Sequence, residues 1–178
     1  MEKSATLSPD GVYRYTLERV WAPSLPRVVW VMLNPSTADA EQDDPTIRRC
    51  VGFAKAWGYG GIVVVNLYAY RTKSPAVLAE MRGMKVDVVG PGNLSAIEGV
   101  LGRPENSLVM LAWGTSKMAE TPDAWRVRAS VWSLANDKVS CLGVTKGRAP
   151  RHPLYVRGSA YPIPAGPVMS LRESWLSD

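Results

Sequence analysis

Four short polar segments hold the residues whose types are best suited to chemistry. Asn34 opens the first segment and Asn66 the second, Trp113 and Gly114 begin the third, and His152, the one histidine of the chain, lies in the fourth. An amide offers both a donor and an acceptor, which suits the edge of a nucleobase. A histidine titrates near neutral pH and can stabilise a developing charge. These residue types favour a site that binds a base-bearing ligand and reacts with it.

Further residues around these four supply hydroxyl groups, aromatic rings and positive charge. Aromatic rings can stack on a base, and basic loop residues can contact phosphates. The full set of candidate binding residues is Pro35, Ser36, Thr37, Asn66, Tyr68, Tyr70, Arg71, Trp113, Gly114, Lys146, Arg148 and Arg151. Each segment alone also has a structural interpretation, as a turn, a strand cap, a core tryptophan or a solvated basic loop. The set together favours function, because all four segments follow apolar runs.

Those apolar runs predict the elements that position the site. Four of them have the composition of strands covered on both faces, at residues 27–33, 62–67, 108–113 and 138–144. Helical patterns separate the runs, and Asp44-Pro45 is a favourable start for the first helix. The alternation predicts an α/β fold, a three-layer sandwich with a four-stranded parallel core sheet, and residues 12–21 predict an added N-terminal edge strand. Ligands bind beyond the carboxyl ends of such strands, where the polar segments begin.

Composition limits the class of protein. The 178 residues, 46% hydrophobic and 21% charged, predict one globular domain spanning residues 1–178. No apolar run is long enough to cross a bilayer and the N-terminus lacks a signal-peptide pattern, so we expect a cytoplasmic protein without a membrane partner. Two cysteines and one histidine are too few for an ordinary zinc or iron–sulfur site, so we expect no metal and no cofactor. The net charge of +5 suits a nucleic-acid partner, DNA more than RNA, and we expect a monomer.

The order of the four motifs resembles the uracil-DNA glycosylase superfamily. Its members have a water-positioning loop after the first strand, a base-reading asparagine after the second, an apolar strand ending in WG or its equivalent, and a late histidine loop. Here LNPST resembles the INPG loop of the mismatch-specific branch, and NLYAYRTKSP resembles the NVVKCRPP segment of the thermostable branch, within a resemblance that covers roughly residues 28–155. The stretch LNPSTADAEQDDPTIRRC also resembles the signature of an uncharacterised family of bacterial and phage proteins, and that resemblance covers nearly the whole chain.

The superfamily resemblance implies a uracil-DNA glycosylase-like fold and hydrolysis of an N-glycosidic bond in nucleic acid. Asn34 would position the attacking water, Asn66 would read the base edge, and His152 would stabilise charge on the departing base. Asp43, a carboxylate near the first loop, is a further catalytic candidate for activating the water, whereas its neighbour Asp44 is expected to cap the helix.

Departures from the superfamily pattern bear on the substrate. Met32 and Ser36 replace the small glycines that flank the first loop, and Thr46 stands where an aromatic ring would stack on uracil. We therefore expect a modified or non-uracil base. Two other functions stay open: an inactive nucleic-acid or nucleotide-binding module of the same fold, and an enzyme of free nucleotides. A wide basic groove would favour a polymer, and a small closed cavity would favour a free nucleotide.

Overall fold

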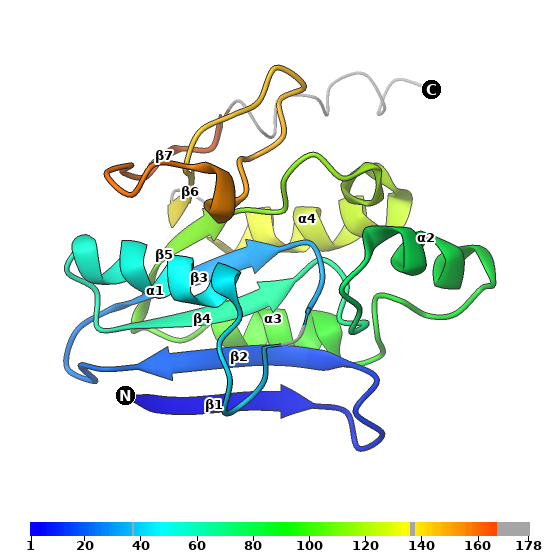
Figure 1. Ribbon diagram of the computed structural model, residues 1–178, viewed down its shortest axis with the longest axis horizontal. Coiled ribbons are helices and arrows are strands. Elements are labelled where there is room, and N and C mark those ends of the chain that lie inside the picture. The colour runs from blue at the N-terminus through cyan, green and yellow to red at the C-terminus, as the bar shows by residue number, and fades with distance from the viewer. Residues whose placement is uncertain (37, 136–137, 167–178) are drawn as a thin grey trace.

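The fold is built on one mixed β-sheet with helices on both faces (Figure 1). The structure is a computed structural model that describes residues 1–36, 38–135 and 138–166. Within these ranges the sheet has seven strands in the order β1-β2-β4-β3-β5-β6-β7. Their bounds are β1 Glu2–Leu7, β2 Arg14–Val20, β3 Arg27–Met32, β4 Gly61–Asn66, β5 Asn106–Leu111, β6 Val139–Cys141 and β7 Ile163–Pro164. The main helices are α1 Pro45–Ala56, α2 Pro75–Gly83, α3 Asn93–Leu101 and α4 Pro122–Ala135.

The strand pairings show which part of the sheet is parallel. β3 pairs in parallel with β4 on one side and with β5 on the other, and β5 pairs in parallel with β6. The β1–β2, β2–β4 and β6–β7 pairs are antiparallel. The predicted α/β class is therefore confirmed, but the sheet is larger and more mixed than four parallel strands with one edge strand.

The N-terminal edge strand was predicted in the wrong place. Residues 12–21 contain β2, which lies between β1 and β4, and the outer strand is β1. The side chains of β1 are mostly exposed, whereas Leu17 and Arg19 of β2 are fully buried. A tight turn at Gly11, which has φ of +70°, folds β1 back onto β2 and so supplies the edge.

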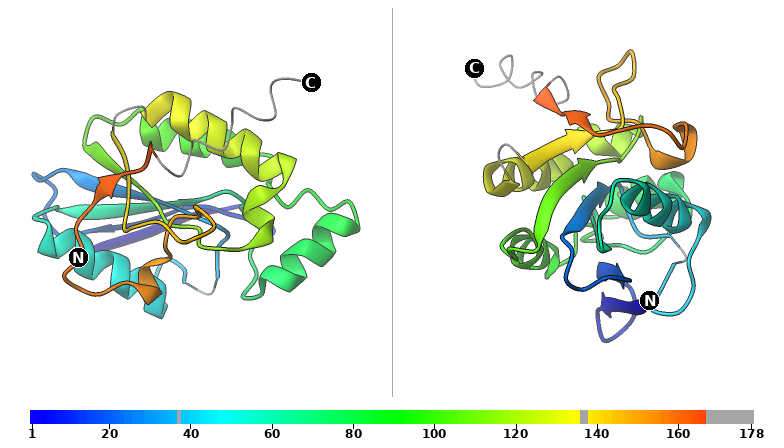
Figure 2. Two further views of the ribbon diagram at one scale, coloured as in Figure 1. Left: turned by 90° about the horizontal axis from the view of Figure 1, so that it is seen from above. Right: turned by 90° about the vertical axis from the view of Figure 1, so that its left-hand side faces the viewer.

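Two hydrophobic clusters occupy the two faces of the sheet. Because side chains alternate along a strand, Val28 and Trp30 of β3 pack toward α1, whereas Val29 and Val31 pack toward α3 and α4. Figure 2 shows α1 on one face and α3 and α4 on the other. All four side chains are fully buried, which explains why this part of the sequence is an unbroken apolar run.

The parallel strands direct their carboxyl ends to one edge of the sheet. The loops after β3, β4 and β5, and the segment after β6, therefore begin close together (Figure 1). No helix in the described part of the chain is long and apolar enough to span a membrane.

Candidate functional site

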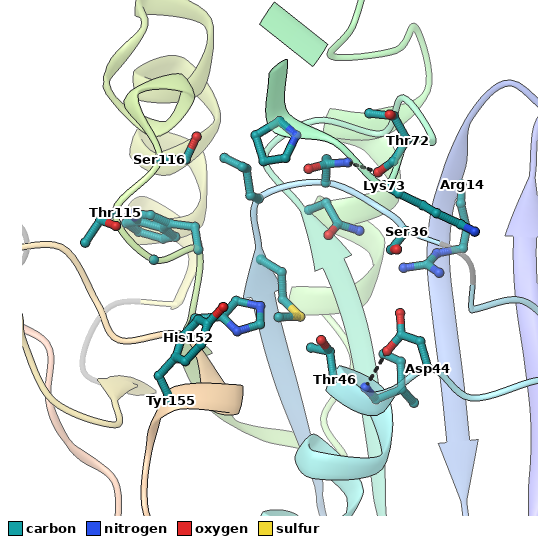
Figure 3. Close-up of a pocket in the computed structure, with 18 residues that line it drawn as sticks. Arg14, Ser36, Asp44, Thr46, Thr72, Lys73, Thr115, Ser116, His152 and Tyr155 are labelled. Atoms are coloured by element: carbon teal, nitrogen blue, oxygen red, sulfur yellow. Dashed lines mark hydrogen bonds between the residues drawn. The ribbon is translucent and has the colours of Figure 1, made fainter. Parts of the chain in front are cut away.

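A cavity of about 350 Å³ lies at the carboxyl ends of β3, β4 and β5 (Figure 3). This volume is at the lower end of the range of small-molecule sites, about 300–1,000 Å³. The structure brings together six of the residues predicted from the sequence in its lining, namely Asn34, Ser36, Asn66, Trp113, Gly114 and His152. Residues from all four polar segments therefore meet at one cavity.

Asn66 is the least exposed polar residue of the cavity lining. It ends β4, its side chain is 1% exposed, and neither Oδ1 nor Nδ2 has a hydrogen-bond partner in the described residues. The backbone at this strand end is fixed by Asn93 of α3, whose Nδ2 donates to the carbonyl oxygens of Asn66 at 3.0 Å and Leu67 at 3.3 Å. A buried amide without partners is unfavourable by roughly 1–3 kcal/mol. Asn66 is thus held in place with its donor and acceptor unused.

Asn34 follows β3 and has a fixed orientation. Its Nδ2 donates to the carbonyl oxygen of Thr72 at 2.7 Å and to that of Pro35 at 3.1 Å. Both donor positions of the amide are therefore engaged, and Oδ1 accepts no hydrogen bond from the described residues. At the cavity, Oδ1 of Asn34 can therefore accept a hydrogen bond from a ligand or from water.

His152 reaches the cavity from the loop after β6. Its Nδ1 accepts a hydrogen bond from the backbone N–H of Leu154 at 3.4 Å, which caps the short 3₁₀ helix η3, Pro153–Tyr155. Burial lowers the pKa of His152 below its ordinary value of 6.5, and Asp44 opposes the shift. With Nδ1 accepting, the neutral ring carries its proton on Nε2. His152 can therefore present a neutral N–H donor.

Arg49 and Gly114 hold the histidine loop against the rest of the domain. The guanidinium of Arg49 on α1 donates to the carbonyl oxygens of Pro153 and Val156. The N–H of Gly114 donates to the carbonyl oxygen of Pro150 at 3.0 Å. The position of His152 thus depends on both the end of β5 and one face of α1.

Trp113 lines the cavity as part of an aromatic and cationic stack. Its ring lies 4.8 Å from the guanidinium carbon of Arg128, which itself lies 3.7 Å from the ring of Trp125. Arg128 is 3% exposed and donates to the carbonyl oxygen of Ala119 at 3.0 Å. The indole therefore rests on a fixed cation and forms a rigid wall.

Arg14 is a cavity residue that sequence analysis missed. It starts β2, is 3% exposed, and extends toward the cavity near Ser36 and Asp44 (Figure 3). Its Nη1 donates to the carbonyl oxygen of Ala38, and its buried Nε has no partner in the described residues. Burial lowers the pKa of Arg14 to about 10, so the side chain stays cationic at neutral pH. The only hint in the sequence was a basic residue between two tyrosines in a strand-like segment.

The two adjacent carboxylates of the first loop have separate surroundings. Asp44 lines the cavity, and its Oδ1 accepts from the N–H of Ile47 at 2.9 Å as the N-cap of α1. Asp43 does not line the cavity, and its Oδ1 accepts from Nε of the fully buried Arg19 at 2.7 Å. The structure therefore brings Asp44, rather than the predicted Asp43, to the cavity.

Several predicted binding residues lie away from this cavity. Tyr68 is buried, and its hydroxyl bonds the carbonyl oxygen of Met118 at 2.8 Å. Tyr70 and Arg71 line a second cavity next to the first. The remaining predicted residues are Pro35, which is buried, and Lys146, Arg148 and Arg151, which are exposed on the loop after β6; Thr37 lies outside the described residues.

Metal-binding groups are scarce around the site. No cluster of three or more histidine, cysteine, aspartate or glutamate side chains within the described ranges could hold a metal ion. The cysteines Cys50 and Cys141 are buried free thiols whose pKa values burial raises. The polar groups that line the cavity are amides, hydroxyls, a histidine, the cations Arg14 and Lys73 and a single carboxylate, Asp44, a set suited to a polar organic ligand.

Comparison with known proteins places the chain in a family. No curated protein and no solved structure matches it. A family model, described as Protein of unknown function (DUF1643), matches residues 14–154. This region begins at Arg14 and includes the whole histidine segment as far as Leu154, so it covers nearly all the cavity lining. Because the match spans well over half of its length, the chain belongs to the DUF1643 family.

Proposed function

We propose that the protein is an N-glycosyl hydrolase that removes a modified or non-uracil base from nucleic acid, with DNA as the preferred polymer. The observation that carries the proposal is the Asn66 amide, 1% exposed and without a hydrogen-bond partner among the described residues, in the lining of a cavity that Asn34 and His152 also line. A donor and an acceptor on one rigid group match the paired donor and acceptor on a nucleobase edge. A base that fills the cavity would therefore satisfy both amide atoms.

Asn66 would bind the base, and His152 and Asn34 would each assist one part of the reaction. Cleavage of the bond from the base nitrogen to C1′ of the sugar leaves the electron pair on the base, and water supplies the new oxygen bond to C1′. The Nε2–H of His152 would donate to an oxygen of the departing base and stabilise its negative charge. Oδ1 of Asn34 would accept a hydrogen bond from the attacking water and orient it. The proton released by the water completes the balance when it passes to solvent or to the departing base.

Asp44 would assist through its charge. A glycosidic bond that breaks ahead of water attack leaves positive charge on the sugar, and a carboxylate at the cavity wall lowers the energy of that state. Asp44 keeps its position because its other role is to cap α1.

DNA duplexes that carry a panel of modified bases test the proposal. Each duplex is incubated with the protein, and abasic sites are detected by strand cleavage after alkali treatment. We expect wild-type protein to release at least one base, and we expect Asn66→Ala to lose the preference among bases. A wild type that is inert on every member of the panel, in duplex and single strand, would overturn the proposal.

One observation favours a binding module as the second candidate. The predicted water-activating carboxylate, Asp43, is paired with Arg19 outside the cavity. A protein of this kind would bind a nucleotide or a nucleic acid without turnover. Saturable binding of a panel member, with no abasic product after long incubation, would select this candidate over the hydrolase.

A further inference from the structure

The cavity proposed to hold the base, called the base cavity, adjoins a second cavity of about 440 Å³. Ser36, Thr72 and Lys73 line both. These three residues form a wall shared by the two cavities. Arg14 lines the first cavity and Arg71 lines the second. Any ligand that fills the base cavity and extends past Ser36 therefore meets several cationic side chains.

Both arginines have hydrogen-bonding capacity that the fold does not use. Nε of Arg14 and Nε of Arg71 are buried and have no partner in the described residues. Each guanidinium donates through Nη1 to one backbone carbonyl, Arg14 to Ala38 and Arg71 to Gly11 at 3.0 Å. Five N–H groups on each guanidinium leave donors available after these contacts. Such donors are costly to bury unless water or a ligand accepts from them, and an anionic ligand accepts more strongly than water does.

None of the three cations Arg14, Arg71 and Lys73 forms a close ion pair with a carboxylate of the described residues. Burial is the main cause of the lowered pKa of Arg14, and the positive charges of Arg71 and Arg19 lower it further. Asp44 and Asp39 act on Arg14 in the opposite sense, but no carboxylate of the described residues lies within 4.0 Å of a charged nitrogen of Arg14, Arg71 or Lys73. Oδ1 of Asp39 accepts from the N–H groups of Glu41 and Gln42 instead. The surroundings thus keep an excess of positive charge beside the Ser36 hydroxyl.

We propose that this wall is a phosphate subsite, which holds the phosphate of the same nucleotide whose base enters the cavity. Its residues are Arg14, Ser36, Arg71 and Lys73. The inference rests on the proposed function for the identity of the base-bearing ligand, but the anion site itself depends only on the arginines. Guanidinium groups bind phosphate oxygens through paired N–H donors, and a hydroxyl and an ammonium group complete the shell. Arg14 would thereby anchor the nucleotide at a point distinct from the exposed basic loop after β6.

Inorganic phosphate is the first probe, with binding measured by calorimetry at low salt. We expect saturable one-site binding by the wild type. Loss of one charge-assisted contact weakens binding about tenfold, so we expect that factor for Arg71→Gln and for Lys73→Gln. Arg71 is partly buried and Lys73 is exposed, so we expect both variants to fold, which circular dichroism checks; Arg14→Gln tests the buried member. Arg126→Gln, at an exposed arginine of α4, is the matched control and should bind as the wild type does.

The second probe asks which nucleotide phosphate is held. A single-stranded oligonucleotide with a central tetrahydrofuran abasic site is compared with versions in which one adjacent phosphate is a neutral methylphosphonate. We expect one of these replacements to weaken wild-type binding about tenfold and to have no further effect in Arg71→Gln. A parallel comparison of deoxynucleoside 5′-monophosphates with their nucleosides forms the free-nucleotide arm of the experiment. In either arm, coupling means that removal of the phosphate charge weakens binding by the wild type and not by Arg71→Gln. The arm that shows coupling identifies the source of the phosphate.

The outcomes separate this inference from the proposed function. Phosphate binding that depends on Arg71 and Lys73, in a protein that releases no base, keeps the subsite and rejects the hydrolase. Base release by a wild type whose phosphate affinity is unchanged in Arg71→Gln and Lys73→Gln keeps the hydrolase and overturns the subsite. Absence of phosphate binding by the wild type, or coupling in neither arm, also overturns it.

Discussion

Gly114 lies beside His152 at the end of β5. A Cβ added to Gly114 would lie 3.4 Å from Cβ of His152, and Gly114 has φ of +74°, a conformation that L residues rarely adopt. The glycine thus serves both the turn after β5 and the close approach of the histidine loop. Gly114, which has no Cβ, therefore helps to position the one histidine of the chain.

Gly114→Ala tests this contact. We expect a loss of about 1–2 kcal/mol in the free energy of unfolding, because the backbone conformation is unfavourable with a Cβ. Base release should also fall, because a change of backbone conformation at Gly114 alters the segment that holds the histidine loop through the hydrogen bond to Pro150. Gly52→Ala is the matched control, since Gly52 lies in α1, where an added Cβ would meet nothing within 4 Å, and the change should be neutral or stabilising. Urea denaturation and single-turnover rates measure the two effects.

Asn66→Leu should separate stability from function. The substitution removes an amide whose two polar atoms are buried and have no partner in the described part of the chain, so we expect the free energy of unfolding to rise by about 1–3 kcal/mol. The same protein should lose base recognition. Asn106→Leu is the comparison, because Asn106 is 1% exposed, lies outside the cavity and donates to Val100 O at 2.6 Å. It should destabilise the fold and leave base preference intact. A less stable Asn66→Leu protein would contradict the assigned role.

The lowered pKa of His152 predicts the direction of a pH effect. In the unfolded chain His152 takes up a proton near its ordinary pKa of 6.5, whereas the folded form takes it up only at a lower pH. Its contribution to stability is therefore present above pH 6.5 and is lost as pH falls through 6.5 toward the folded pKa. Urea denaturation between about pH 5 and 8 should show this acid-side loss in the wild type and a smaller one in His152→Gln.

Asp43 and Asp44 should respond differently to loss of charge. Asp43→Asn leaves the fully buried Arg19 without its ion pair, and we expect a loss of about 1–3 kcal/mol in stability with base release retained in the folded protein. Asp44→Asn keeps an N-cap oxygen, so stability should change by only a few tenths of a kcal/mol while base release slows. Loss of turnover in Asp43→Asn, at full folding, would restore the sequence-based role of Asp43.

The exposed loop after β6 should govern the salt dependence of nucleic-acid binding. Lys146 and Arg151 are exposed and close in sequence to His152, and we expect them to contact phosphates of a bound strand. Neutralising one phosphate contact lowers the slope of log K against log salt by about 0.7–0.9. We expect this decrease for Lys146→Gln and for Arg151→Gln, measured by fluorescence anisotropy over a salt series. Lys85→Gln, at an exposed lysine after α2, should leave the slope unchanged.

The central strands and their polar ends could be predicted from the sequence because burial on both faces leaves a continuous apolar run. The predicted strands at 27–33 and 62–67 agree with β3 and β4 to within a residue at each end. The convergence of Asn66 and His152 on one cavity followed from the rule that parallel strands share a carboxyl edge. Local patterns and one topological rule sufficed for these features.

Other features depend on long-range packing, which sequence patterns do not record. β1 is a polar strand, and only its pairing with β2 gives it that conformation. Arg14 is buried because the first loop and β2 enclose it, and nothing in an alternating strand marks a basic residue as internal. Asp43 pairs with Arg19, which is distant in sequence, and Asp44 lines the cavity instead. The sequence around the two carboxylates does not show which of them pairs with Arg19.

The position of β2 in the sheet affects how the chain folds during its synthesis. β2 ends at Val20, but the strand that it pairs with on its inner side, β4, starts only at Gly61. At synthesis rates of roughly 5–20 residues per second, the β1–β2 hairpin is made about 2–9 s before its partner strand β4 is complete. During that delay its inner edge is open to wrong pairing, and the charged residues Glu18 and Arg19 on β2 discourage it. The hairpin is thus the first element of the sheet to be synthesised and can join the sheet only after β4 has appeared.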